Sequence, residues 1–249
     1  MRIIFSPTKT MRELPGGMRG LSLPEMLPKT ECLLRRLKEM TGPELKALWG
    51  CSDRIASQNL ERIKNTDLRR DLSPALLSFE GISFRYMAPE SFREKETEYV
   101  QEHLRILSGF YGVLRPMDGI RAYRLDAADR LCGESFGDLY DFWGGDIYES
   151  VRDDSGVIIN LASGEYSVCI KKYLRPEDRF INCSFAEKTD GKLRQKGTFA
   201  KMARGAMLRF MAENSTDSPE MVKSFRGLGF SFSPEDSSEN EYVFIREPV

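Results

Sequence analysis

The sequence has a single histidine, His103, and five scattered cysteines among its 249 residues. The cysteines are odd in number and form no C-x-x-C pair, which argues against a disulfide framework and a thiolate zinc site. With one histidine, an imidazole-based metal site is unsupported, and a Ser/His/Asp triad would need this residue. We therefore expect no metal site and no cofactor, and we interpret His103 as a core or boundary residue on the apolar face of a helix.

An excess of one charge sign is also missing. Lysine and arginine number 37 and aspartate and glutamate 38, so the net charge is -1 and gives no overall attraction to nucleic acid or membrane. Any basic surface must be a local patch. No apolar run approaches the ~18 residues of a membrane span, and the N-terminus lacks the long apolar region of a signal peptide. We expect a cytoplasmic protein without a membrane partner.

What the sequence does contain is enough apolar residues, 41%, for a real core, and two runs that predict buried strands. These runs are residues 2–5 and 157–161. Polar loops follow both, at Ser6–Thr10 and at Asn160–Tyr166. Open α/β sheets bind ligands where loops leave the strand ends. The two junctions therefore predict a cleft at one edge of the sheet, with Lys9 as a candidate site residue or, alternatively, a solvated loop lysine.

The remaining patterns predict helices between and after these strands. Residues 23–64 are dominated by helical signals, with the capping-box spacing at Thr41 and Glu44 and a C-cap at Gly50. Further helices are predicted over 75–79, 94–107 and 199–214, and further strands over 81–86, 180–185, 193–199, 229–233 and 242–246, with Asp190-Gly191 as a hairpin turn. No repeat or linker interrupts the chain. We expect one α/β domain, residues 1–249, with a mixed β-sheet, surrounding helices and a helical block at about 23–107 inserted between strands.

The stretch from Tyr99 to Pro116 has two interpretations. Val100, Leu104 and Leu107 recur at the i, i+4, i+7 spacing of one helical face. Gly109 and Gly112 then bracket a turn, after which a short basic segment restarts and Pro116 ends it. This order is typical of a helix-hairpin-helix nucleic-acid contact and equally of an ordinary structural turn. Lys201 and Arg204 form a second small basic face on the helix predicted at 199–214.

Several segments, in order along nearly the whole chain, resemble the YaaA-type peroxide stress proteins. They are SPTKT (6–10), SD (52–53), HLRILSGFYGVLRPMD (103–118), YRL (123–125), DLYDFWG (138–144), INLASGEY (159–166), AKMARG (200–205) and the Ser237-Ser238 loop. The resemblance implies a cytosolic bacterial protein that protects against hydrogen peroxide and limits damage by free iron. It also implies one compact domain of unusual mixed fold that binds duplex DNA through a basic cleft and a helix-hairpin-helix.

Two functions remain open from the sequence. The first is binding of double-stranded or structured DNA, for which the candidate contacts are Lys9, Ser108, Gly109, Gly112, Arg115, Arg124, Lys201 and Arg204. The second is an enzyme acting on nucleic acid or a small metabolite, for which the loop-tip candidates are Lys9, Tyr123, Asn160, Ser163 and Glu165. In that case Lys9, with a lowered pKa, would form a Schiff base with an abasic sugar. Direct iron sequestration is disfavoured, because the sequence has no cluster of ligands with metal spacing.

Overall fold

Strand β1 (Arg2–Phe5) lies at the centre of the sheet. It pairs in parallel with β5 (Leu104–Ser108) on one side and with β8 (Val157–Leu161) on the other. Ile3 and Ile4 are fully buried, as expected for a parallel strand covered on both faces. The predicted strands at 2–5 and 157–161 are therefore confirmed, and they are neighbours although more than 150 residues separate them along the chain.

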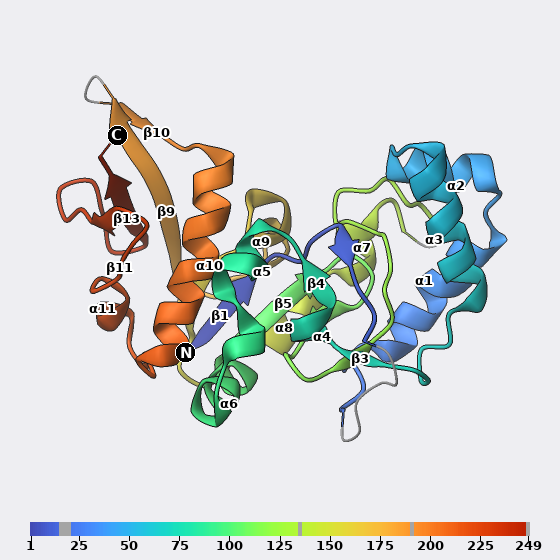
Figure 1. Cartoon of the computed structure of the whole chain (residues 1–249), viewed down its shortest axis with the longest axis horizontal. Helices are drawn as coiled ribbons and strands as arrows, with labels where there is room; N and C mark the ends of the chain where they lie inside the picture. The colour runs from blue at the N-terminus through green and yellow to red at the C-terminus, as the bar shows by residue number, and fades with distance from the viewer. Residues whose placement is uncertain (15–20, 134–135, 190–191, 248–249) are drawn as a thin grey trace.

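The full sheet is mixed. The computed structural model describes residues 1–14, 21–133, 136–189 and 192–247. In this part of the chain the sheet has nine strands, in the order β11-β12-β13-β9-β8-β1-β5-β6, with β10 beside β9 (Figure 1). The additional strands are β6 (Gly112–Leu114), β9 (Arg179–Thr189), β10 (Lys192–Arg194), β11 (Arg226–Gly227), β12 (Phe230–Phe232) and β13 (Glu241–Arg246). Two small sheets pair β2 (Thr10–Met11) with β4 (Phe79–Glu80) and β3 (Ser73–Pro74) with β7 (Gly119–Ile120).

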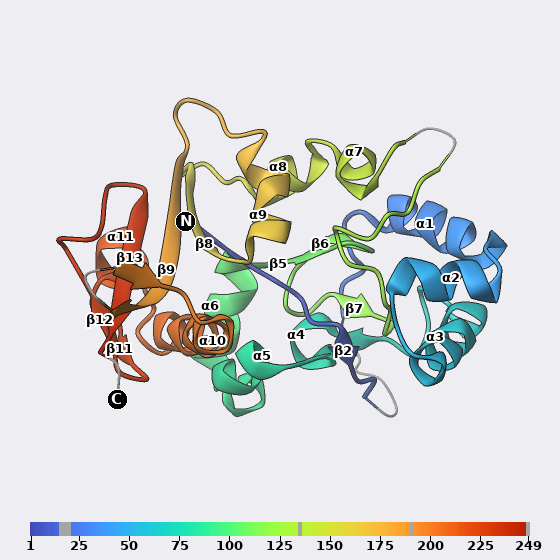
Figure 2. The ribbon, with the colours of Figure 1, turned by 90° about the horizontal axis from the view of Figure 1, so that it is seen from above.

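Helices cover both faces of the central strands (Figure 2). On one face lie α4 (Ala75–Ser78), α5 (Ile82–Met87), α6 (Glu94–His103) and α10 (Gly197–Glu213), and on the other lie α7 (Leu139–Trp143), α8 (Asp146–Val151) and α9 (Gly164–Lys171). Helices α1 (Leu27–Glu39), α2 (Gly42–Trp49) and α3 (Asp53–Asn65) group at the end of the molecule farthest from β13, whereas the 3-10 helix η1 (Pro89–Ser91) follows α5 and α11 (Pro219–Val222) lies near β13. The predicted α/β domain with a mixed sheet is confirmed.

Several local predictions are also confirmed. The backbone N–H of Thr41 donates to Glu44 Oε2 at 2.7 Å, which completes the capping box of α2, and Gly50 ends that helix with a φ of 51°. The strands predicted over 229–233 and 242–246 are β12 and β13, which pair antiparallel. Strands β9 and β10 pair antiparallel, but the turn predicted at Asp190-Gly191 lies outside the described residues. The second strand of that hairpin ends at Arg194, because α10 begins at Gly197.

One predicted element is wrong in type. The strand predicted over 81–86 is helix α5, in which Phe84 and Met87 are buried one helical turn apart against neighbouring elements. Tertiary packing here overrides the local signal. The helix predicted over 75–79 is confirmed as α4, which ends one residue earlier, at Ser78, and follows the two residues of β3 that pair with β7.

The helix-hairpin-helix predicted from the glycine turn is not formed. Helix α6 ends at His103, and the chain continues as strands β5 and β6, which pair antiparallel across the turn. All residues of the segment 104–114 are buried, because β5 joins the central strand β1. Phe110 fills the turn and packs on the ring of Tyr123 at 5.2 Å, where a phosphate-binding hairpin would need open backbone. Gly112, at φ +74°, sits so close to Met26 and Trp143 that no side chain would fit.

Candidate functional site

The two predicted strand-to-loop junctions meet at one point of the sheet. From β1 the chain crosses to β5 on one side, and from β8 it crosses to β9 on the other, so the strand order reverses between β1 and β8. This is the position at which open α/β sheets bind ligands. The backbone N–H of Ser163 donates to Ser6 Oγ at 2.8 Å, and the two serine hydroxyls are 3.1 Å apart.

A cavity of about 350 Å³ opens at this reversal of strand order, and we call it the switch-point cavity. Its walls come from segments that are distant in sequence: the β1–β2 loop, the start of α5, the loop around residue 126, the start of α9 and the first half of α10. The polar residues that line it are Ser6, Thr8, Lys9, Thr10, Glu80, Ser83, Asp126, Ser163, Glu165, Tyr166, Lys201 and Arg204. Sequence reasoning had placed five of these, Lys9, Ser163, Glu165, Lys201 and Arg204, among the site candidates, and the structure brings them together.

Helix α10 is held over the cavity by a very close contact with α5. A Cβ atom added at Gly205 would lie 1.9 Å from the carbonyl oxygen of Ser83, so only glycine permits this approach. Arg204 directly precedes Gly205 on this helix, and Lys201 lies about one turn before it. The guanidinium of Arg204 is largely buried, burial lowers its pKa, and its Nε makes no hydrogen bond within the described residues.

Lys9 is engaged by a carboxylate at the rim of the same cavity. Its Nζ lies 2.7 Å from Asp126 Oδ2, and this hydrogen bond raises the pKa of Lys9. The hydroxyl of Tyr166 donates to the other oxygen of Asp126 at 3.2 Å. A Schiff-base lysine needs a lowered pKa so that its amine is free at neutral pH. The enzyme hypothesis required a lowered pKa for Lys9 as a nucleophile, and the contact with Asp126 acts in the opposite direction.

Asp129 adds a second carboxyl group behind this pair. Its Oδ2 accepts a hydrogen bond from the backbone N–H of Asp126 at 2.8 Å. Burial, together with the charge of Asp126, raises the pKa of Asp129 to about 6. This group was missed by sequence reasoning, because nothing in its local pattern indicates that the loop folds over Lys9.

The other catalytic candidates divide into cavity residues and structural residues. Glu165 lies in the first turn of α9, and its Oε1 accepts a hydrogen bond from the N–H of Ala128 at 3.2 Å. Asn160 is buried and donates to Asn182 at 2.7 Å, which joins β8 to β9 at the last residue pair of their register. Tyr123 shares a 2.6 Å hydrogen bond with Ser108, and burial raises its pKa. Asn160 and Tyr123 therefore support the fold and do not line the cavity.

The predicted nucleic-acid contacts also divide. Ser108, Gly109 and Gly112 are buried in the β5–β6 hairpin and cannot reach a ligand. Arg115 follows β6, which runs antiparallel to β5. It therefore lies at the opposite end of the strands from the cavity, where it pairs with Asp118 at 3.3 Å. Arg124 donates to the carbonyl of Trp49 at 3.4 Å and lies outside the cavity lining.

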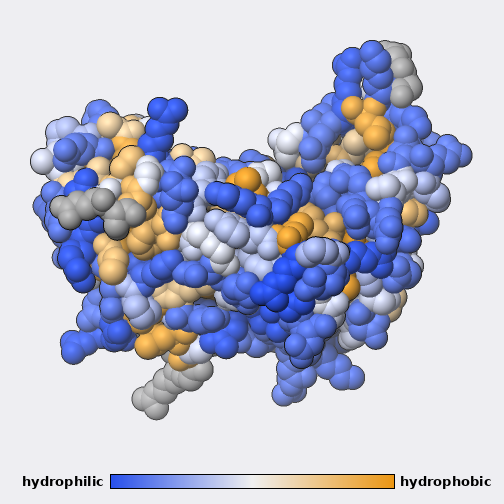
Figure 3. Space-filling view, turned by 180° about the vertical axis from the view of Figure 1, so that it is seen from behind, coloured by the Kyte–Doolittle hydropathy of each residue, from blue (hydrophilic) through white to orange (hydrophobic). Residues whose placement is uncertain are grey.

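Strand β9 projects beyond its neighbour β8, a feature that was not predicted from the sequence. Pairing of β8 with β9 ends at Asn182, yet β9 continues to Thr189, which adds roughly 20 Å of strand. Strand β10 pairs with this projecting part and leads into α10. From behind, the upper edge of the molecule is hollowed between a lobe that carries β9 and β10 and a lobe that carries α1 to α3 (Figure 3).

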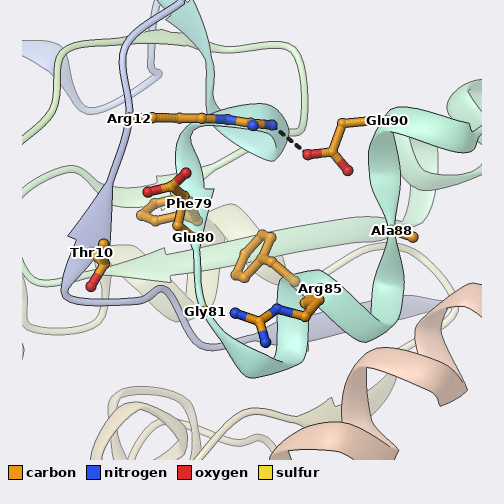
Figure 4. Close-up of a pocket in the computed structure, with 9 residues that line it drawn as sticks. Thr10, Arg12, Phe79, Glu80, Gly81, Arg85, Ala88 and Glu90 are labelled. Carbon is orange, nitrogen blue, oxygen red and sulfur yellow. Dashed lines mark hydrogen bonds and ion pairs between the residues drawn. The ribbon is translucent and has the colours of Figure 1, made fainter.

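A second cavity of about 480 Å³ adjoins the first across Thr10, Glu80 and Gly81, which line both. Figure 4 shows Arg12 and Glu90 joined by an ion pair at one side and Arg85 on the other side of the opening. Phe84 also lines this cavity and is almost fully buried. The two cavities therefore lie next to each other along β2, β4 and α5.

The fold and site define an α/β protein with a cavity at the reversal of strand order and hydroxyl, cationic and carboxylate groups around it. In the part of the chain that the structure describes, no three His, Cys, Asp or Glu residues are grouped to hold a metal ion. Among the same residues, no helix is both long enough and apolar enough to cross a lipid bilayer.

The chain belongs to the family described as peroxide stress protein YaaA, whose model matches residues 1–236. It is similar over 99% of its length to a protein named UPF0246 from Agathobacter rectalis, with 49% identity over 99% of that protein. A UPF0246 protein of Lachnoclostridium phytofermentans is 44% identical over 99% of this chain and 96% of its own length. One of Pediococcus pentosaceus is 42% identical over 100% of this chain and 99% of its own length. The family supports a role in peroxide stress.

Proposed function

We propose that this protein acts in peroxide stress by binding DNA in the hollow beside β9 and β10. The observation that carries the proposal is a row of cations on the segment that forms one wall of this hollow. Its members are Lys192, Arg194, Lys201 and Arg204. Within the described residues none of the four forms an ion pair, whereas the neighbouring Lys188 and Lys196 pair with Asp236 and Glu187.

This row gives a nearly neutral protein the local basic surface that DNA binding requires. Lys192, Arg194 and Lys201 are exposed, so they can contact phosphates without losing other partners. Such contacts position the duplex without reading its sequence. If these three exposed cations neutralise phosphates, the logarithm of affinity should fall with the logarithm of salt concentration with a slope of about -3. The hairpin at 109–112 takes no part in this interface.

The test is fluorescence anisotropy of a labelled 20-base-pair duplex, titrated with protein at several salt concentrations. We expect Lys192→Gln with Arg194→Gln to weaken binding about tenfold and to reduce the salt slope by about 2. The matched control is Lys95→Gln, an exposed cation on α6 at the far side of the molecule, which should leave binding unchanged. Absence of binding at low salt, or equal loss in the control, would refute the proposal.

A further inference from the structure

The switch-point cavity shares Lys201 and Arg204 with the proposed wall for duplex DNA, but it also has features that a bound duplex would not use. It is recessed between α5, α9 and α10, and its volume of about 350 Å³ suits a small molecule or a single nucleotide. A duplex is far too wide to enter it. Any ligand of the cavity must therefore be smaller than a duplex, and the charges around the cavity indicate the chemistry of that ligand.

The cationic side of the cavity is formed by α10. Arg204 is a largely buried guanidinium without a counter-ion among the described residues, which is a costly arrangement for a protein to maintain. Lys201 lies about one turn away on the same helix and is exposed at the mouth. An anion with several oxygen atoms would satisfy both side chains at once, because guanidinium groups bind phosphate and carboxylate oxygens in pairs.

The start of α9 faces the same space. Its first N–H groups, at Gly164 and Glu165, make no hydrogen bond within the described residues, as expected for the first turn of a helix. Gly164 is exposed, and nothing lies within 4 Å of a Cβ placed on it. The N–H of Ser163 is already used by Ser6, and the hydroxyls of these two serines lie between the helix and β1. Backbone donors at a helix start favour an anion.

Carboxylates also line the cavity, and one of them, Glu165, lies in the first turn of α9. Asp126 is neutralised by Lys9, but Glu80 and Glu165 form no ion pair within the described residues and are exposed at the mouth. They accept hydrogen bonds and repel a second anionic group. The cavity thus suits a ligand with one compact anion and neighbouring hydroxyl or amino donors. A phosphate attached to a sugar and base has this combination.

We propose, building on the DNA-binding function, that the switch-point cavity binds the phosphomonoester of a nucleotide, with Lys201, Arg204 and the first N–H groups of α9 as its ligands. A phosphomonoester carries close to two negative charges at pH 7 and three acceptor oxygens, and a phosphodiester carries one charge. A phosphomonoester occurs at a DNA strand end or on a free nucleotide. An end can enter a recessed cavity, whereas a phosphate within an intact duplex cannot.

The test compares four probes by anisotropy and competition. The first two are 20-base-pair duplexes with a one-nucleotide gap, whose upstream strand ends in a 3′-phosphate or in a 3′-hydroxyl. The others are the intact duplex and thymidine 3′-monophosphate as a competitor. We expect the 3′-phosphate duplex to bind at least tenfold more tightly than the 3′-hydroxyl duplex.

Variants connect this preference to the cavity. Lys201→Gln, at an exposed position, should remove most of the preference, and Arg204→Lys should retain part of it. The wall variant Lys192→Gln should weaken both duplexes equally and keep the preference. Melting curves establish that each variant is folded. Because Arg204 is largely buried, a loss of the preference in Arg204→Gln supports the site only if Lys201→Gln loses it as well.

The outcomes separate this inference from the proposed function. Equal affinity for phosphate and hydroxyl ends, with wall-dependent binding of intact duplex, would overturn the phosphomonoester site and leave DNA binding standing. Binding of thymidine 3′-monophosphate that depends on Lys201, without binding of any duplex, would support the site with a free nucleotide as the source and overturn the DNA proposal. A preference that survives Lys201→Gln and Arg204→Gln would refute the assigned ligands.

Discussion

The contact between α5 and α10 can be tested by replacing Gly205 with alanine. The new Cβ would lie 1.9 Å from the carbonyl oxygen of Ser83 and 3.0 Å from the backbone nitrogen of Met87. Both neighbours are backbone atoms, so no side-chain rotation can relieve the clash, and the helices must separate by more than 1 Å. Overpacking of this kind costs typically 1 to 3 kcal/mol.

The expected change in melting temperature follows from this cost. A backbone clash falls at the upper end of the range, and for a chain of this size about 3 kcal/mol corresponds to a melting temperature lower by roughly 6 to 12 °C. Calorimetry or circular dichroism measures it. Because α10 carries Arg204 and Lys201, any shift of the helix also moves the cations at the switch-point cavity.

A matched control lies in the same helix. At Gly197 nothing lies within 4 Å of an added Cβ, and alanine favours a helix over glycine by up to about 1 kcal/mol. Gly197→Ala should therefore leave the melting temperature unchanged or raise it slightly. If Gly205→Ala melts within 1 °C of the parent protein, the two helices are not in backbone contact and the reasoning about this wall of the cavity fails.

Three further predictions address the site and its support. Borohydride treatment of the protein with abasic DNA should trap no adduct, because the pKa of Lys9 is raised; an adduct that disappears in Lys9→Ala would contradict this. Burial raises the pKa of Asp129 to about 6, so its protonated form is favoured in the folded state and stability is lost as pH rises from about 4 to about 6. Urea denaturation across this interval should show a smaller loss for Asp129→Asn, and an unchanged pH dependence would refute the assignment. Trp143→Phe removes a 3.0 Å hydrogen bond to the β5–β6 turn, so the free energy of unfolding measured by urea denaturation should fall by about 1 to 3 kcal/mol. The indole N–H of Trp49 has no partner within the described residues, so Trp49→Phe should cost less. Equal losses would contradict this account.

The central strands and the position of the cavity could be predicted because their signals are local. β1 and β8 are short apolar runs that end in polar loops, and parallel strands bring such ends to one edge of a sheet. The prediction that Lys9 and Ser163 lie at one cleft needed no knowledge of the connections between them. Helix α10 was predictable for the same reason, since its apolar and basic faces are both visible in the sequence.

The segment 104–107 was predicted as helix and is strand, and one residue, Arg105, accounts for the error. Arg105 lies inside β5 and is only 8% exposed, which is unusual for a charged side chain in a buried strand. Its guanidinium turns back to the end of α6 and donates to the carbonyls of Glu102 and Leu104 at 3.2 and 2.8 Å. With Arg105 counted as exposed, the apolar spacing fits a helix, and only the pairing with β1 decides otherwise.

The surroundings of Arg204 could not be predicted, because they depend on long-range contacts. The cavity forms where α10 meets α5, and the sequence of α5 predicts a strand when it is considered alone. Asp126 and Asp129 reach Lys9 through a loop that has no regular pattern. Residue type and spacing indicated which cations belong to the site, but which carboxylates face them depends on how three distant segments fold together.

The place of β13 in the sheet affects how the protein is made. β13 follows every other described strand in the sequence, yet it lies between β9 and β12 and pairs with β9 along Asn182 to Glu187. Until it leaves the ribosome, one edge of the long strand β9 has unpaired backbone groups, and Phe185 lacks its partner Phe244, 5.4 Å away. Exposed edges of this kind pair with other chains. Slow synthesis or premature termination near residue 240 should therefore favour aggregation over release of a folded protein.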